Sequence, residues 1–135
     1  MPLSPKYPKQ IITIADHLRK RRLDLKLSQI AVSRLIGVTE DTITYWENGR
    51  TVPLISAIPA VITFLGYNPY DVDTSTLGGK VKQFRLMKGL SLKNFAKLLH
   101  VDPSTVKTWE ENEFTPESAN YKRLMDCLEL MNYSV

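Results

Sequence analysis

The sequence predicts an all-α protein built from two tandem copies of one small domain. Apolar residues recur three and four positions apart, as they do on the buried face of a helix. Apolar and polar residues alternate for no more than a few positions at a time, so no β-strand is expected. The stretch TITYWENGRTVP at 42–53 returns as TVKTWEENEFTP at 105–116, which indicates an internal duplication.

The duplication extends over most of the chain. Residues 14–65 align with residues 77–128 without a gap, and Arg22 then meets Arg85. A length of 135 residues is enough for two small domains. We therefore expect an irregular arm at 1–10, a first domain at 11–66, a linker at 67–76 and a second domain at 77–135.

The first two helices of the first domain are delimited by turn and capping residues. One helix is expected from about Ile14 to Leu23. Ser28 is a good N-cap for a second helix at 29–36, because its hydroxyl can accept from a free amide of the first turn. Gly37 follows, and glycine suits the left-handed backbone at which helices often end. Two short helices around such a turn predict the helix-turn-helix arrangement.

The third helix of the first domain is expected at 40–48, with Thr39 as its N-cap. Ile43 and Trp46 lie three positions apart and predict its buried face, so the Trp is interpreted as a core residue. A last apolar segment follows, in which Pro59 is expected within the first turn of a helix.

The second domain repeats this plan with different residues at the turns. Ser91 is the expected cap of its second helix, and His100 takes the place of Gly37. Asp102 is the expected cap of its third helix, with Pro103 in the first turn. The pair at 78–79, Gly-Gly, is interpreted as a joint at the start of this domain.

Composition and charge exclude several classes of protein. A net charge of +4, from 18 basic and 14 acidic residues, is a modest indication of a polyanionic partner. Cys127 is the only cysteine, so neither an internal disulfide nor a multi-cysteine zinc site is expected, and an apolar surrounding predicts that it is buried. His17 and His100 have no cluster of ligating residues at metal spacing. We therefore expect no metal, no cofactor, no enzymatic activity, no membrane span and a cytoplasmic protein.

The segment at 18–53, LRKRRLDLKLSQIAVSRLIGVTEDTITYWENGRTVP, resembles the helix-turn-helix domains of phage repressors and Cro and of bacterial regulators of the xenobiotic-response-element (XRE) type. Shared features are Leu-Arg, a further Arg, Ser-Gln, Gly at the turn, and Glu-Asn-Gly before a basic residue and Pro. Ser33 departs from the Ala usual in the family. The second domain matches less closely. The resemblance implies two tandem lambda-repressor-like DNA-binding domains of four or five helices.

The same resemblance implies roles for individual residues. Arg22 with Glu47, and Arg85 with Glu110, would form structural ion pairs between the first and third helices. The helix at 40–48 would enter the major groove of double-stranded DNA, with Gln29 contacting a phosphate and bracing the residues that contact bases. The expected DNA contacts of the first domain are Gln29, Thr39, Glu40, Asp41, Thr44, Tyr45, Asn48 and Arg50.

Two alternatives stay open within that set. Glu40 and Asp41 would either accept from cytosine amino groups or serve only the positive end of the helix dipole. Tyr45 would either contact a thymine methyl group or lie on the surface.

In the second domain, the helix at 103–111 is the corresponding candidate. The expected DNA contacts of this domain are Lys93, which precedes that helix, and Ser104, Thr105, Lys107 and Thr108. Leu92, Glu111 and Glu113 stand where the first domain has Gln29, Asn48 and Arg50. Either both domains bind, so that one chain acts as a pseudo-dimer on two half-sites, or the second domain mediates homodimerisation or binds a protein partner.

The sequence-based prediction is thus a sequence-specific transcriptional regulator, a repressor of bacterial or phage type associated with the nucleoid. The alternative is an antitoxin-like or other protein-interaction module that keeps the fold but has weak or no DNA binding.

Overall fold

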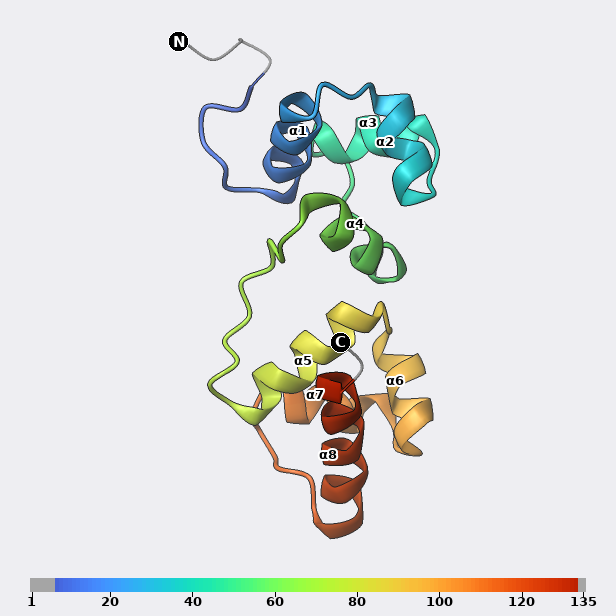
Figure 1. Cartoon of the computed structure of the whole chain (residues 1–135). Coiled ribbons are helices and arrows are strands. Elements are labelled where there is room, and N and C mark those ends of the chain that lie inside the picture. The colour runs from blue at the N-terminus through green and yellow to red at the C-terminus, as the bar shows by residue number, and fades with distance from the viewer. Residues whose placement is uncertain (1–6, 134–135) are drawn as a thin grey trace. The chain divides into compact units, whose positions relative to one another are not determined.

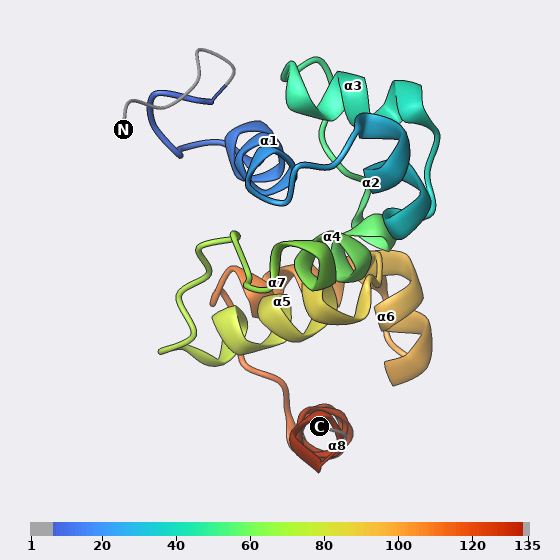
Figure 2. The ribbon, with the colours of Figure 1, turned by 45° about the horizontal axis from the view of Figure 1, so that its top comes forward.

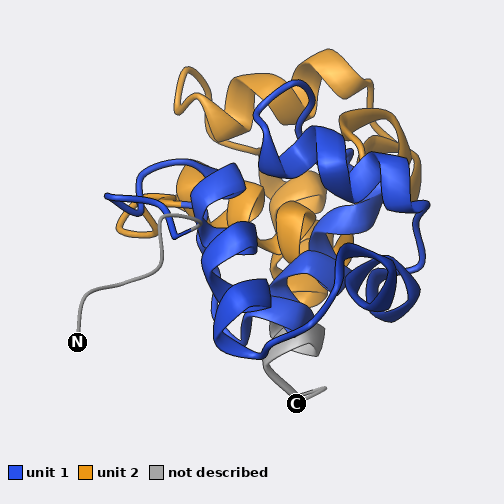
Figure 3. Cartoon of the chain, turned by 90° about the horizontal axis from the view of Figure 1, so that it is seen from above, with its two compact units in different colours: residues 1–70 blue, residues 71–135 orange. Residues whose placement is uncertain are grey.

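The computed structural model of the chain describes residues 7–133, which form helices joined by turns and loops, with no strand among them (Figure 1). The helices fall into two compact units, residues 1–70 and residues 71–135, coloured separately in Figure 3. The all-α prediction is confirmed. None of the helices within 7–133 is long and apolar enough to cross a membrane.

The described part of unit 1, residues 7–70, contains four α-helices, the last of them preceded by a short 3-10 turn at residues 55–57. Apolar side chains from all four α-helices form one core, which includes Trp46 with only 4% of its surface exposed. The α-helices are α1 (Ile14–Asp24), α2 (Gln29–Ile36), α3 (Glu40–Glu47) and α4 (Ile58–Leu65). The buried core residues are Leu18, Val32, Ile36, Ile43, Trp46, Val61, Phe64 and Leu65.

Local capping explains where these helices begin and end. Ser28 accepts a hydrogen bond from the amide of Ala31 and starts α2 at the predicted residue. Gly37 ends it with a φ of +89°, in the left-handed region that glycine adopts without strain. α3 ends at Glu47, one residue before the predicted end, because Asn48 has already left the helical conformation and serves as its C-cap.

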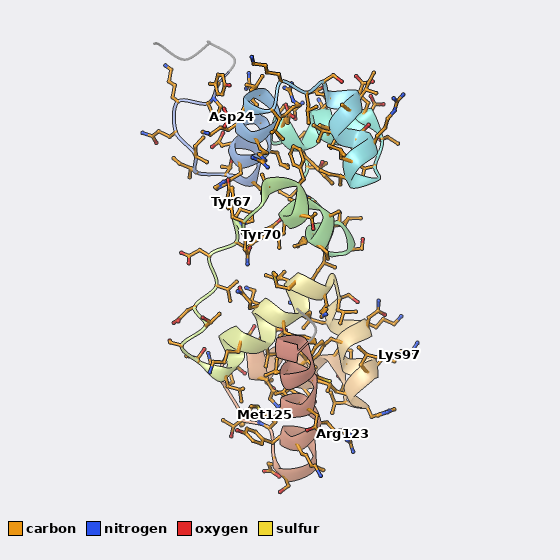
Figure 4. The ribbon with its side chains drawn as sticks, in the orientation of Figure 1. Asp24, Tyr67, Tyr70, Lys97, Arg123 and Met125 are labelled. Atoms are coloured by element: carbon orange, nitrogen blue, oxygen red, sulfur yellow. The ribbon has the colours of Figure 1, made fainter. Side chains whose placement is uncertain are left out.

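Unit 2 repeats the arrangement and ends in a longer helix, α8, which is seen along its axis in Figure 2. Its helices are α5 (Leu77–Lys88), α6 (Leu92–Leu99), α7 (Pro103–Glu110) and α8 (Ser118–Tyr133). Trp109 is 4% exposed and occupies the core position of Trp46. The buried core residues are Val81, Phe84, Phe95, Ala96, Leu99, Val106, Trp109 and Leu124. Arg123 of α8, labelled in Figure 4, donates from Nη1 to the carbonyl of Leu99 at 2.9 Å.

The turn between α6 and α7 lacks the glycine of unit 1. His100 takes that place with a φ of +58°, which is uncommon for a residue with a Cβ atom. Its backbone amide donates to the carbonyls of Ala96 and Lys97 and closes the end of α6. The same helix-turn-helix geometry is therefore reached with a residue less suited to the left-handed conformation.

The interpretation of Gly78 and Gly79 as a joint is wrong. Both are buried in the first turn of α5. A Cβ atom on Gly78 would lie 2.4 Å from the carbonyl oxygen of Trp109, and one on Gly79 would lie 1.6 Å from that of Asp73. The two glycines therefore allow other backbone segments to approach the start of α5 closely.

The segment expected as a linker, 67–76, is attached to the helices at both ends. The hydroxyl of Tyr67, labelled in Figure 4, lies 2.6 Å from Nδ1 of His17 on α1. At the other end, Thr76 caps α5 by accepting from the amide of Gly79. Part of the expected N-terminal arm, residues 1–6, and residues 134–135 of the expected second domain lie outside the described residues.

Candidate nucleic-acid interface

The turn between α2 and α3 fixes how the third helix of unit 1 is presented. The amides of Gly37 and Val38 both donate to the carbonyl of Ser33, at 2.8 and 3.0 Å. Ser33 is itself buried, and its hydroxyl donates to the carbonyl of Ile30 at 2.6 Å. A serine is thus accommodated at this position because its polar group is satisfied within α2.

The two sides of α3 differ sharply in exposure. Ile43 is 1% exposed and faces the core together with Trp46. The opposite side carries polar residues, of which Thr44 is half-buried and the rest are exposed. We call this side the front of α3; it consists of Thr39, Glu40, Asp41, Thr44 and Tyr45.

Arg22 of α1 and Glu47 of α3 form a two-point ion pair behind that front. Arg22 Nε lies 2.6 Å from Glu47 Oε2, and Arg22 Nη2 lies 2.8 Å from Glu47 Oε1. Arg22 Nη1 also donates to the carbonyl of Leu27 at 3.3 Å. The pair joins the end of α3 to α1 and holds the loop before α2.

Gln29, the first residue of α2, lies between this ion pair and the front of α3. Its Nε2 donates to Glu47 Oε1 at 3.3 Å, and its Oε1 accepts from the Thr44 hydroxyl at 2.8 Å. The Thr44 hydroxyl is also 3.2 Å from the carbonyl of Glu40. Both ends of the Gln29 amide are therefore bonded within the protein, which leaves one Nε2 hydrogen for an external acceptor.

The residues after α3 are held by their own contacts. Asn48 Oδ1 accepts from the amide of Arg50 at 3.0 Å, which fixes the turn around Gly49. The guanidinium of Arg50 lies over the ring of Tyr45, with Cζ 5.3 Å from the ring centroid. Tyr45 thus lies on the surface in contact with Arg50, and both side chains are exposed.

A shallow polar pocket of about 240 Å³ opens where α1, α2 and α3 meet. Arg19 lines it, although sequence analysis did not select this residue. The available signal was its position three residues before Arg22, which places both on one side of α1. The other lining residues are Arg22, Gln29, Thr44, Glu47 and Asn48.

Unit 2 has the same ion pair but a different surface. Arg85 Nε lies 2.7 Å from Glu110 Oε2, and Arg85 Nη2 lies 3.0 Å from Glu110 Oε1. Glu111 and Glu113 are exposed where unit 1 presents Asn48 and Arg50. The surface that follows α7 is therefore acidic rather than basic.

The candidate residues of α7 are partly engaged with their own unit. The Ser104 hydroxyl donates to Asp102 Oδ1 at 2.6 Å, and the Thr108 hydroxyl donates to the carbonyl of Thr105 at 2.7 Å. Hydrogen bonds from the Ser104 hydroxyl and amide hold the pKa of Asp102 below its usual value. Lys107 Nζ is exposed and 4.0 Å from Glu111 Oε1. Lys93 is exposed on α6.

Within residues 7–133, no three His, Cys, Asp or Glu side chains are placed to share a metal ion. Cys127 is half-buried rather than fully buried, and burial raises the pKa of its thiol.

Comparison with known proteins locates the two units independently. A family model described as helix-turn-helix matches residues 18–72 and matches again at residues 81–130. The first match contains most of α1 together with α2, α3 and α4, and the second contains most of α5 together with α6, α7 and much of α8. No curated protein and no solved structure matches the chain.

Proposed function

The chain belongs to the XRE-type helix-turn-helix family of DNA-binding regulators, in two tandem copies, and we propose that it is a sequence-specific repressor. In this proposal the front of α3 in unit 1 enters the major groove of double-stranded DNA, where a recognition helix contacts base edges with its N-terminal residues. The observation that carries it is the asymmetry of α3. Its back is buried around Trp46 and fastened by Glu47, while its front is polar and open.

Phosphate contacts would come from the cations and amides beside that front. Asn48 and Arg50 follow α3 directly, and Arg19 lines the pocket beside Gln29. Such contacts set the position of a protein on DNA without selecting sequence. Gln29 would contribute its one unused Nε2 hydrogen to a phosphate while its other bonds hold Thr44 in place.

Unit 2 would add a second, weaker contact to the same DNA molecule. Its exposed candidates are Lys93 and Lys107, whereas Glu111 and Glu113 repel phosphates. A chain that binds with both units would imitate the two-fold dimers of the family and span half-sites about 10 base pairs apart. The acidic surface also favours the alternative in which unit 2 contacts a protein or a second copy of the chain.

Selection of random double-stranded DNA by the intact chain tests the proposal. We expect a defined sequence to be enriched and its affinity to fall steeply with salt, because bound phosphates release counterions. Footprints of the wild type, Lys107→Ala and Ser104→Ala on that sequence then separate the two models for unit 2. A shorter or weaker footprint with these variants supports contact by both units, and an unchanged one leaves unit 1 as the only DNA-binding unit.

Enrichment of no sequence, or an affinity insensitive to salt, would contradict the proposal. It would favour the protein-interaction module, in which the helix-turn-helix fold is kept and DNA binding is weak or lost. Association with the nucleoid of a bacterial cell, in place of a uniform distribution, is the corresponding expectation in vivo.

A further inference from the structure

We propose that the front of α3 recognises the exocyclic amino groups of adenine and cytosine, because the hydrogen bonds behind it leave it with acceptors at Glu40, Asp41 and Thr44. This inference rests on the proposed function, since it concerns which base edges α3 selects once it lies in the major groove. The inference is drawn from a chain of hydrogen bonds that runs from Glu47 through Gln29 to Thr44. The buried carboxylate of Glu47 determines which group donates at each step.

The fixed end is the carboxylate of Glu47, which Arg22 contacts at both oxygens. An ionised carboxylate accepts hydrogen bonds and donates none. The group of Gln29 that lies 3.3 Å from Glu47 Oε1 must therefore be the amide nitrogen. The Glu47 carboxylate thus determines the orientation of the Gln29 amide, whose two ends are otherwise hard to distinguish.

With the nitrogen toward Glu47, the oxygen of Gln29 points to Thr44. Two oxygens 2.8 Å apart share one proton, and an amide oxygen has none to give, so the Thr44 hydroxyl donates. Its nearest other acceptor is the carbonyl of Glu40 at 3.2 Å, which also belongs to the protein. In either case the hydroxyl proton is used internally, and only the lone pairs of Thr44 Oγ1 are left for a ligand.

Two further side chains on the front, those of Glu40 and Asp41, also present only acceptors. Glu40 and Asp41 are exposed in the first turn of α3, and their carboxylates accept only. In the major groove the donors on base edges are N6 of adenine and N4 of cytosine, whereas guanine and thymine present acceptors. Three acceptors in one and a half turns of helix therefore match amino groups and repel the carbonyl edges.

Unit 2 lacks this arrangement, which makes it an internal comparison. Leu92 stands at the Gln29 position, and its apolar side chain cannot form a hydrogen bond with the Glu110 carboxylate. Lys107 stands at the Thr44 position and is a donor only. The preference for amino groups is thus a property of unit 1.

Modified bases placed one at a time in the selected duplex test the inference with the intact chain. N6-methyladenine and N4-methylcytosine lose the major-groove hydrogen of the amino group but keep the Watson–Crick pair. We expect at least one such substitution under α3 to weaken binding about tenfold, the size of one good base contact. The 7-deazapurines, which remove the N7 acceptor instead, are expected to leave binding within about twofold at those positions.

Two variants connect this preference to the hydrogen-bond chain. Gln29→Leu copies the residue of unit 2 and removes the closer acceptor of the Thr44 proton, so that only the carbonyl of Glu40, at 3.2 Å, still competes with a base for it. Thr44→Val removes the hydroxyl at nearly constant shape. Each is expected to lose discrimination at the same single base position, and the double variant to lose no more than either one. Arg50→Ala is the matched control, because loss of a phosphate contact weakens binding without changing base preference.

Each remaining outcome overturns the inference. Binding that is weakened by 7-deazapurines and not by the methylated bases shows that α3 donates hydrogen bonds. Loss of discrimination at different positions in the two variants shows that Gln29 does not act through Thr44. Enrichment of no sequence at all removes the proposed function and this inference together, whereas the other outcomes leave the proposed function standing.

Discussion

Arg22 and Glu47 are joined at two points, with Arg22 Nε 2.6 Å from Glu47 Oε2 and Arg22 Nη2 2.8 Å from Glu47 Oε1. The Glu47 side chain keeps 5% of its surface exposed, so the pair is largely removed from water. Removing one partner would strand the other charge in the protein, which costs about 3–5 kcal/mol. The pair therefore fixes α3 on α1 and simultaneously sets the direction of the hydrogen bonds that end at Thr44.

Arg22→Ala is expected to lower the free energy of unfolding of unit 1 by about 3–5 kcal/mol. The measurement is urea unfolding followed by fluorescence of Trp46, in a Trp109→Phe background so that the signal comes from unit 1. Arg85→Ala, followed by Trp109 in a Trp46→Phe background, should destabilise unit 2 similarly. Weaker DNA binding by Arg22→Ala with unchanged stability would show that this residue contacts DNA instead.

Gly78→Ala is expected to destabilise unit 2 by about 1–3 kcal/mol, the cost of forcing an extra methyl group into a packed site. The added Cβ would lie 2.4 Å from one backbone oxygen and 2.7 Å from another, those of Trp109 and Glu110. Gly49→Ala is the matched control in unit 1. It has nothing within 4 Å of its Cβ position, so it should show only the strain of its φ of +77°, about 1 kcal/mol. Equal losses in both variants would contradict close approach as the reason for Gly78.

The helix boundaries were predictable where they depend on residues next to each other in sequence. Ser28 and Gly37 delimit α2 as expected, because an N-cap and a left-handed C-cap act within one turn. The role of Gly78 was not predictable, since it depends on the backbone of Trp109, which is distant in sequence. The contact between Tyr67 and His17 was not predictable either, because these residues are also distant in sequence.

The candidate site was predictable as a set of positions, but the individual contacts among them were not. The family resemblance implied that Gln29 braces the residues that contact bases, and only the structure shows that its partner is Thr44. Arg19 was overlooked because its signal, a position three residues before Arg22, is hard to separate from solvated surface charge within the basic run RKRR. The contact of Arg50 with Tyr45 likewise depends on the turn at Gly49, whose geometry the sequence does not specify.

Arg50→Ala and Arg19→Ala are each expected to reduce the salt dependence of DNA binding. A lost phosphate contact should lower the slope of log affinity against log salt by about one, with a similar effect on every sequence. Lys122→Ala is the control, because it removes a positive charge from the exposed surface of α8. The measurement is fluorescence anisotropy over a series of salt concentrations. A slope that changes as much for Lys122→Ala would show that only net charge matters.

Low pH is expected to destabilise both units, because it protonates carboxylates that cap the first turns of α1 and α7. Hydrogen bonds from the backbone amides of Thr13 and Ile12 keep the pKa of Asp16 below its ordinary value of 3.8. The Ser104 side chain and amide do the same for Asp102. A pKa that is lower in the folded state contributes stability that is complete above the ordinary value and is lost as the pH falls through the lowered one.

The measurement for this pH effect is the urea midpoint as a function of pH for the wild type and Asp16→Asn. Asparagine retains an acceptor oxygen and does not titrate, so unit 1 of the variant should lose less stability than the wild type below about pH 4. Parallel curves for the two proteins would show that Asp16 has no part in the acid sensitivity.

The most direct test of DNA binding by the front of α3 is an amide chemical-shift map of the intact chain titrated with the selected duplex. If the front of α3 enters the major groove, the largest shifts fall on 39–45, with further shifts at Gln29, Asn48 and Arg50, and Trp46 stays in its buried environment. Shifts confined to α4 or to unit 2, with 39–45 unchanged, would contradict the account.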